Sequence, residues 1–318
     1  MHNLPFSIII PVYNDEKNIT RCIESVISQS FSDFECLLVN DGSTDSTSSI
    51  CATFAQNDSR LKIFNKHNEG ISKTRQFGLD KSNGLYVIFI DSDDWVEPSF
   101  LEKINKKVVS QSRDIIFLDF YNEKSLSREK YYSQKPSFLS SESVIKDVLE
   151  CKLFSCLWNV VLKKSFFYKY NIKFSDSINY GEDTLFITEL LLNKPDVDYL
   201  DEAFYHHTFN RGSYTRKDKK NRFYERVKFL YVLELLLQKY NREDLIKNNF
   251  FPFNDKFEIL SSGIFSKKEY KSLFALSFTQ YYRECSNPVK QYLLLMAETN
   301  FYFFAKLISR MIKTMKIK

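Results

Sequence analysis

Residues 85–95 read LYVIFIDSDDW, an apolar run that ends in three carboxylates within four residues. Tyr86–Ile90 are all apolar or aromatic, which is typical of a strand buried on both faces of a parallel sheet. Such a strand would bring Asp91, Asp93 and Asp94 together at its carboxyl end, where their charges repel one another. A divalent cation relieves that repulsion, and hard oxygen ligands suit Mg²⁺ or Mn²⁺. The alternative is an acidic loop in which Asp94 caps the next helix.

The composition is that of a globular protein with one large core. The chain has 318 residues, 43% of them hydrophobic and 27% charged, and a formal net charge of +5. This length allows one domain with an extension. No apolar run approaches membrane-spanning length, no signal peptide is visible, and the first strand is expected to begin at Phe6. The six cysteines form no Cys-x-x-Cys pair, so we expect reduced thiols and a protein in the cytosol or at the cytosolic face of a membrane.

Apolar strands and amphipathic helices alternate along the first third of the chain. Strands are expected at Phe6–Val12, which Pro11 interrupts, and at Phe34–Val39, Leu61–Phe64 and Tyr86–Ile90, with helices at 19–27, Thr47–Gln56 and Ile71–Lys81 between them. This order implies a parallel sheet with right-handed crossovers and with ligands outside the carboxyl ends of its strands. Asn14, Asp41, the loop at Gly70 and Asp91 follow those ends, so we expect them to meet in one crevice.

The middle of the chain is less regular, and its last third is helical. We expect a helix at Glu97–Gln111, a strand at Asp114–Phe120, a polar loop within Leu118–Lys135, helices at Glu142–Glu150 and Thr184–Asn193, and short strands at Val197–Leu200 and Ala203–Phe209. Beyond residue 218 the pattern favours helices, with amphipathic segments at Phe229–Tyr240, Tyr270–Arg283 and Leu293–Ile317.

Four stretches carry a resemblance to a known family: IPVYN at 10–14, VNDGSTD at 39–45, GISKTRQFG at 70–78 and FIDSDDW at 89–95. In this order they resemble inverting family 2 glycosyltransferases, which have the GT-A fold. The resemblance continues more weakly through Trp158-Asn159 and Gly181-Glu182-Asp183. It implies a Rossmann-like α/β domain over 1–215, with a mostly parallel sheet flanked by helices, a nucleotide-sugar half at 1–100 and an acceptor half at 101–215. A helical extension would occupy 216–318.

The resemblance also implies a metal-dependent hexosyltransferase that uses a nucleotide-sugar, most often a UDP-sugar, as donor. Asp41 would accept a hydrogen bond from uracil, although a turn residue before Gly42 is the plainer interpretation. Asp91 would reach the ribose or the metal ion, and Asp93 would bind the metal ion, Mn²⁺ or Mg²⁺, that bridges the diphosphate. The donor-binding residues implied in this way are Pro11, Tyr13, Asn14, Asp41, Lys73, Arg75, Asp91, Ser92 and Arg211.

The Glu182-Asp183 pair is the candidate catalytic site on the acceptor side. By resemblance, Asp183 is the general base that activates the acceptor hydroxyl, and Glu182 orients the acceptor or supports the loop. Arg75 would face the crevice from its helix and neutralise diphosphate or contact the base. The alternative for the acidic pair is structural, because acidic residues in the first turn of a helix interact well with its dipole.

Two further features near the site have open alternatives. His206 and His207 are adjacent in a predicted strand and therefore face opposite sides of it. His207 is our candidate third metal ligand, although either histidine could touch the metal, and an edge strand with one buried and one exposed histidine is the alternative. Trp158 could stack on a sugar or lie in the core.

The C-terminal segment Pro288–Lys318 combines charge with an apolar stripe. It contains six positively charged residues and one negatively charged residue. Its apolar residues recur at helical spacing: Leu293, Leu294, Phe301, Phe304, Leu307, Ile308, Met311, Ile312 and Met315. Such a helix suits an anionic membrane surface, so we expect peripheral contact at the inner face of the cell membrane. A helix packed on the domain and a subunit contact are the alternatives.

The preferred function is therefore a glycosyltransferase that builds a bacterial surface polysaccharide, such as capsule or lipopolysaccharide, on a glycan or lipid-linked acceptor. A nucleotidyltransferase would need a glycine-rich basic loop after its first strand, and residues 11–15 (PVYND) contain neither glycine nor positive charge. A non-catalytic subunit that binds nucleotide-sugar or glycan remains an alternative. No nucleic-acid partner is expected, and the sequence does not fix the oligomeric state.

Overall fold

The computed structural model of the chain describes residues 4–123, 129–176, 178, 180–208, 219–247, 259–262, 264, 266–273 and 302–315. The chain forms two compact units, Met1–Arg211 and Gly212–Lys318. All described strands belong to the first unit, and the described part of the second unit is built from helices.

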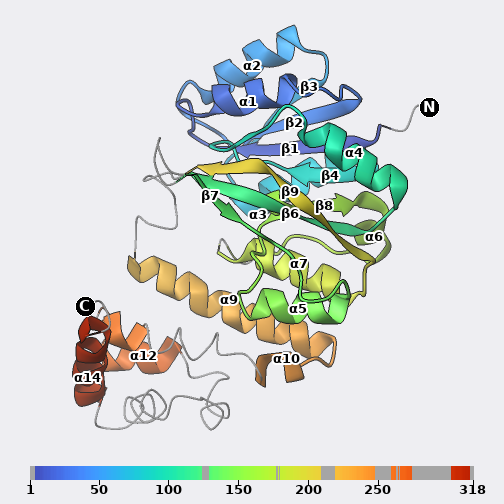
Figure 1. Cartoon of the computed structure of the whole chain (residues 1–318). Coiled ribbons are helices and arrows are strands. Elements are labelled where there is room, and N and C mark those ends of the chain that lie inside the picture. The colour runs from blue at the N-terminus through green and yellow to red at the C-terminus, as the bar shows by residue number, and fades with distance from the viewer. Residues whose placement is uncertain are drawn as a thin grey trace. The chain divides into compact units, whose positions relative to one another are not determined.

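The first four strands of the sheet are parallel, as predicted (Figure 1). They are β1 (Phe6–Val12), β2 (Phe34–Asn40), β3 (Leu61–Asn65) and β4 (Tyr86–Phe89), arranged in the order β3-β2-β1-β4. The connecting helices are α1 (Ile19–Ile27), α2 (Thr47–Asn57) and α3 (Ile71–Lys81). Every residue of β1, β2 and β4 is buried, which explains why these strands read as continuous apolar runs without alternation.

Pro11 lies inside β1 and does not break it, so the predicted interruption is wrong. The carbonyl of Ile9 accepts a hydrogen bond from the N–H of Ile90 (3.1 Å), and Pro11 is the next residue of β1 to face that edge. β4 ends at Phe89, the partner of Ile9. The missing N–H of Pro11 therefore removes no bond from the ladder, and the strand continues.

The second half of the sheet mixes strand directions. β8 (Val160–Lys163) runs antiparallel to β4 and to β6 (Ile115–Glu123), whereas β9 (Val197–Thr208) runs parallel to β6. Two short strands complete the sheet, β5 (Trp95–Val96) beside β9 and β7 (Glu129–Tyr132) beside β6. The helices of this half are α4 (Phe100–Ser110), α5 (Ser141–Leu149), α6 (Lys164–Lys169) and α7 (Glu182–Leu192), with a 3-10 turn at Leu157–Asn159. α5 and α7 pack side by side (Figure 1).

Three predictions in this half are wrong in detail. The loop predicted within Leu118–Lys135 contains the end of β6 and all of β7, because aromatic pairs such as Tyr121 with Tyr131 (ring centroids 5.8 Å apart) join the two strands. The two short strands predicted over 197–209 are one strand, β9, whose register shifts where Asp119 of β6 meets it. The helix predicted from Glu97 begins at Phe100, after β5.

Gly78 allows α3 to lie close to the sheet. A Cβ atom at this position would come within 2.5 Å of Cγ2 of Ile9 in β1. Any larger residue would push the helix outward, and the buried contacts between α3 and the sheet would be lost. Each fully buried aliphatic or aromatic side chain in this core contributes about 1.5–3 kcal/mol. This close packing holds Arg75, one turn earlier in α3, at the carboxyl ends of the strands.

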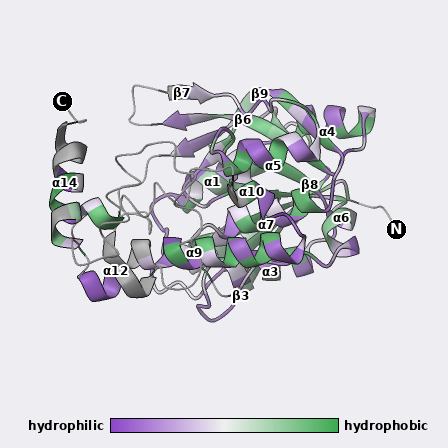
Figure 2. Ribbon diagram, turned by 90° about the horizontal axis from the view of Figure 1, so that it is seen from below, coloured by the Kyte–Doolittle hydropathy of each residue, from purple (hydrophilic) through white to green (hydrophobic). Residues whose placement is uncertain are grey.

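The second unit contains α9 (Lys219–Lys239), α10 (Asp244–Lys247), α12 (Lys267–Leu273) and α14 (Tyr302–Met315). Figure 2 shows both hydrophobic and hydrophilic residues along α9. The segment predicted to be amphipathic, Phe229–Tyr240, falls almost entirely in α9; Leu233 and Leu237 are buried, but Tyr231 and Leu235 are exposed, so its apolar residues are not confined to one face. In α14, Tyr302, Ala305 and Ser309 are buried, whereas Phe303 and Leu307 are exposed. The helix predicted at Tyr270–Arg283 overlaps α12, and its residues beyond Leu273 lie outside the described part. Among the described helices, none is long and apolar enough to cross a membrane.

Candidate active site

The acidic end of β4 is fixed to β9 by Asp94. This carboxylate is fully buried and accepts hydrogen bonds from the hydroxyl of Tyr205 (2.5 Å) and the N–H of Thr208 (2.7 Å). Nδ1 of His207 lies 3.2 Å from the same carboxylate. Burial raises the pKa of Asp94; His207 opposes this shift, and Asp91 adds to it. The alternative role of Asp94 as a helix cap is wrong, because the next helix, α4, follows Ser99.

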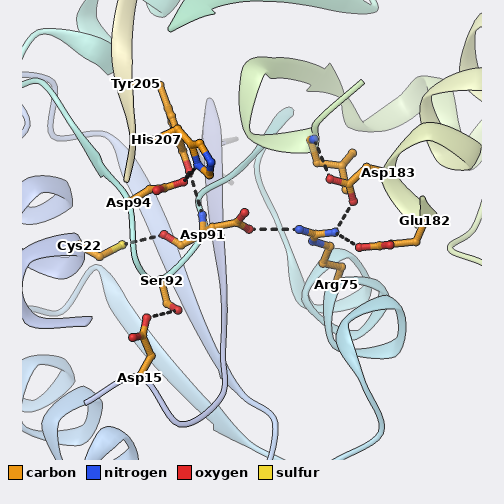
Figure 3. Close-up of polar contacts among 11 residues, drawn as sticks. Asp15, Cys22, Arg75, Asp91, Ser92, Asp94, Glu182, Asp183, Tyr205 and His207 are labelled. Carbon is orange, nitrogen blue, oxygen red and sulfur yellow. Dashed lines mark hydrogen bonds and ion pairs between the residues drawn. The ribbon is translucent and has the colours of Figure 1, made fainter. Parts of the chain in front are cut away.

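Arg75 joins the two halves of the unit through three carboxylates (Figure 3). Its guanidinium group is buried and lies 3.1 Å from Oδ1 of Asp91, at the end of β4. The same group pairs with Oε1 of Glu182 at 3.0 Å and with Oδ1 of Asp183, both in the first turn of α7. The predicted donor residue Arg75 therefore contacts both predicted catalytic residues and the predicted metal ligand Asp91.

Asp183 has the electrostatic setting of a base that works near neutral pH. Burial raises its pKa to about 7, Arg75 opposes that rise, and the charges of Glu182 and Asp91 add to it. The backbone N–H of Leu157 donates to Oδ2 of Asp183 (3.3 Å), while Arg75 holds Oδ1. A carboxylate with this pKa is ionised in a large fraction of molecules at pH 7 and can still take up a proton.

Asp41 is a structural anchor for the loop that precedes α3. It is buried, and it accepts hydrogen bonds from Nζ of Lys66 (2.5 Å) and from the backbone N–H groups of Glu69 (3.0 Å) and Gly70 (2.9 Å). Its oxygens are therefore engaged within the protein. Lys73, another predicted donor residue, lies on α3 with its ammonium group 3.3 Å from Glu69.

Other predicted donor residues connect the loops around the crevice. Asn14 has a left-handed backbone (φ 49°), and its Oδ1 accepts a hydrogen bond from the N–H of Thr44 (2.8 Å). Ser92 donates to Oδ2 of Asp15 (2.6 Å), which ties the acidic end of β4 to the end of β1. Tyr13 is exposed beside Asn14, whereas Pro11 is buried in β1. Arg211 lies outside the described residues.

The two histidines face opposite sides of β9, as predicted. His206 is buried, with its ring stacked on Trp95 (centroids 3.6 Å apart) and on Tyr121 (4.9 Å). His207 lies on the face that carries Asp94 and remains partly exposed. Burial lowers the pKa of His207, but the hydrogen bond to Asp94 and the charges of Asp94, Asp91 and Asp93 together outweigh this effect, and the pKa is raised overall.

Trp158 belongs to the core and has no exposed face for a sugar. Its indole is buried and stacks on Tyr205 (4.8 Å) and on His207 (5.1 Å). Of the two alternatives for Trp158, the structure supports core packing.

The acidic end of β4 has ligands that suit a hard divalent cation. In the described part of the chain, no three His, Cys, Asp or Glu side chains are already grouped closely enough to hold a metal ion. Asp91 and Asp93 are both partly exposed, however, and supply the carboxylate oxygens that Mg²⁺ and Mn²⁺ prefer. The residues present therefore fit such an ion, with His207 on the same side of β9.

Sequence reasoning missed two residues that position this site, Tyr205 and Arg21. The hydroxyl of Tyr205 contacts both Asp94 (2.5 Å) and the N–H of Asp91 (3.2 Å). The guanidinium group of Arg21 donates to the carbonyl of Asp93 (2.8 Å) and to the hydroxyl of Thr208 (2.7 Å). Nothing in the local sequence separates Arg21 from an ordinary surface residue of α1, so only the folded chain reveals its role.

Comparisons of the sequence with known proteins point to one family. The sequence profile of glycosyl transferase family 2 matches residues 7–176. Glycosyltransferase GlyA of Streptococcus pneumoniae is 32% identical over 66% of this chain, and the glycosyltransferase EpsJ of Bacillus subtilis is 30% identical over 66%. The matched regions span 31% and 62% of the lengths of these two relatives.

Solved structures with the same fold include two proteins with bound nucleotide-sugars. S. aureus TarS 1–349 in complex with UDP-GlcNAc has a TM-score of 0.73 at 21% identity, covering 98% of this chain and 92% of that one. The mannosyltransferase PcManGT from Pyrobaculum calidifontis, in complex with GDP-Man and Mn²⁺, has a TM-score of 0.56 at 12% identity, covering 96% and 86%. These likenesses confirm the predicted GT-A fold.

Proposed function

The chain belongs to glycosyltransferase family 2, and we propose that it transfers a sugar from a nucleotide-sugar, with UDP as the preferred nucleotide, to a hydroxyl group of a glycan or lipid-linked acceptor in polysaccharide synthesis. The observation that carries this proposal is the placement of Arg75 between the acidic end of β4 and Asp183 of α7. That placement sets a candidate base beside a candidate diphosphate site. The UDP-GlcNAc complex of a protein with the same fold supports the choice of donor.

On the donor side, Asp91, Asp93 and His207 would hold Mn²⁺ or Mg²⁺. When bound, the cation would neutralise the diphosphate and make it a better leaving group. We propose that Asn14, Asp41 and Ser92 shape the donor pocket by fixing its loops, with Asp41 also accepting a hydrogen bond from the base. The other proposed donor contacts are Pro11, Tyr13, Lys73 and Arg211.

On the acceptor side, Asp183 would take the proton of the acceptor hydroxyl as its oxygen attacks the anomeric carbon. The bond from that carbon to the diphosphate oxygen breaks at the same time, so attack from the opposite face inverts the configuration. Glu182 would orient the acceptor. We propose that Arg75 aligns Asp183 with Asp91 and limits the repulsion among the three carboxylates, since its one positive charge contacts all of them.

The proposal is tested by incubating the 318-residue chain with a panel of UDP-, GDP- and dTDP-sugars and measuring the released nucleotide. We expect release from one UDP-sugar with Mn²⁺ or Mg²⁺, loss of release in EDTA, and loss of release for Asp93→Ala with Mn²⁺ present. Full activity in EDTA would contradict the metal assignment. No release from any donor would contradict the enzymatic function and favour a binding subunit.

We also propose that the second unit contacts the inner face of the cell membrane through α14. Phe303, Leu307 and Ile308 are exposed on this helix, which also carries Lys306 and Arg310. Exposed apolar residues beside positive charges suit an anionic lipid surface. We expect the protein to sediment with anionic vesicles and not with neutral ones. Sedimentation that is insensitive to lipid charge and to salt would count against this surface.

A further inference from the structure

Phe154 is an aromatic residue that the proposed reaction does not use. Its side chain is 45% exposed, although its ring packs edge-on against Phe120 (centroids 5.4 Å apart) and Tyr132 (5.7 Å). Phe120 also packs against Trp158 (4.7 Å), which in turn stacks on His207. These rings therefore form one continuous cluster on the face of the sheet that carries Asp94 and His207.

Buried polar groups hold the backbone of Phe154 rigidly. Its N–H donates to Oε1 of Gln134 (2.7 Å), and its carbonyl accepts a hydrogen bond from Nδ2 of Asn159 (3.2 Å). Nδ2 of Asn159 also donates to Oε1 of Gln134 (3.2 Å), and both side chains are buried. Burying two amide side chains carries a desolvation cost that these hydrogen bonds offset in part, since Oδ1 of Asn159 is buried without a hydrogen-bond partner among the described residues. These buried hydrogen bonds therefore hold the backbone that carries the exposed ring of Phe154 in place.

The segment that carries Phe154 runs along the start of α7, where the candidate base lies. The next residue, Ser155, shares a hydrogen bond with the hydroxyl of Thr184 (2.6 Å), the neighbour of Asp183. Leu157 donates its N–H directly to Oδ2 of Asp183. The exposed ring therefore belongs to the same short segment that holds the base in place.

We propose that Phe154, with Tyr132 beside it, is the stacking platform for a sugar ring of the acceptor. This inference rests on the proposed function and narrows its substrate class: the acceptor presents a pyranose ring near the reacting hydroxyl, and is not an acyclic polyol phosphate. One face of a pyranose is lined with C–H groups that pack well on the electron-rich face of an aromatic ring. Lys130 lies over the ring of Tyr132 (4.6 Å), so Phe154 supplies the more accessible ring.

The test measures how added acceptors stimulate nucleotide release from the donor found in the screen. The acceptor probes are cellobiose, lactose and chitobiose, which contain rings, and ribitol 5-phosphate, which does not. We expect at least one disaccharide to raise release above hydrolysis, and its half-saturating concentration to rise about tenfold in Phe154→Ala. Phe154→Trp should restore it. The matched control is Phe138→Ala, which removes a 75% exposed phenylalanine from the same unit and should change nothing.

The outcomes separate this inference from the proposed function. Two results would overturn the role of Phe154 while leaving the proposed function intact. In the first, the wild type hydrolyses donor but only ribitol 5-phosphate stimulates nucleotide release. In the second, a disaccharide stimulates release equally well in the wild type and in Phe154→Ala. If the wild type hydrolyses no donor, the proposed function fails, and saturation-transfer NMR with the same disaccharides then tests Phe154 only as a sugar-binding surface. Binding that is lost in Phe154→Ala and kept in Phe138→Ala would support it, and equal or absent binding would overturn it.

Discussion

The donor half and the acceptor half of the first unit each contain an aspartate that pairs with a cation, Asp41 and Asp183, and the two have different surroundings. Asp41, in the donor half, accepts hydrogen bonds from one ammonium group and two backbone N–H groups. Asp183, in the acceptor half, shares one guanidinium with Glu182 and Asp91, and burial raises its pKa to about 7. A carboxylate surrounded by donors is an anchor, whereas one that shares a single cation with other carboxylates can exchange a proton.

The strongest test of this contrast is Asp183→Asn. The amide keeps the shape of the side chain but cannot accept the acceptor proton, so turnover should fall by about 10² or more. The donor KM should change little, because Asp183 lies on the acceptor side. Steady-state kinetics at saturating donor measures both values. Weakened donor binding with unchanged turnover per bound donor would mean that Asp183 is structural.

The pH dependence of turnover should be a smaller effect than the loss in Asp183→Asn, and its direction follows from the pKa of Asp183. Because the pKa of Asp183 is raised to about 7, its basic form is lost as the pH falls below that value. Turnover should therefore fall about tenfold per pH unit on the acid side and level off above pH ~7.5. Arg75 opposes the rise in the pKa of Asp183. A lysine cannot contact all three carboxylates equally, so Arg75→Lys should raise this pKa further and shift the acid side of the pH profile to higher pH. If the acid side of the pH profile does not shift in Arg75→Lys, the titration of another group, such as His207, controls it.

Asp41→Asn should affect stability more than chemistry. The substitution leaves Lys66 without its buried partner and weakens the two backbone hydrogen bonds to the loop before α3. We expect a loss of about 1–3 kcal/mol in the free energy of unfolding, measured by urea denaturation. Turnover by the folded fraction should fall far less than in Asp183→Asn. If Asp41→Asn loses as much turnover as Asp183→Asn, then Asp41 is not only a structural residue and the contrast between the two aspartates is wrong.

The same two halves differ in how much of them the sequence predicts. In the donor half, β1 to β4 and the helices between them lie where the local patterns predict them. β5, at the end of the donor half, forms only because β9, far along the chain, pairs with it. In the acceptor half, β7 forms a hairpin with β6 in a stretch whose polar residues predict a loop. The site shows the same limit, since Asp183 and Arg75 are 108 residues apart and their contact has no local signal. The resemblance indicated both residues, but only the fold shows that they share one ion pair.

The smallest expected effect concerns Lys73, where the structural and the donor-binding interpretations predict different measurements. Its ammonium group and the carboxylate of Glu69 are 44% and 45% exposed, so their ion pair is largely screened by water. Pairs this exposed contribute little to stability, and Lys73→Ala should barely change the free energy of unfolding. If Lys73 contacts the diphosphate, the same substitution should raise the donor KM about tenfold while turnover stays near the wild-type value. Lys81→Ala, at the far end of α3, is the matched control for loss of one positive charge. Equal donor KM values for the two variants would mean that Lys73 does not contact the donor and that the donor contacts lie only at the strand ends.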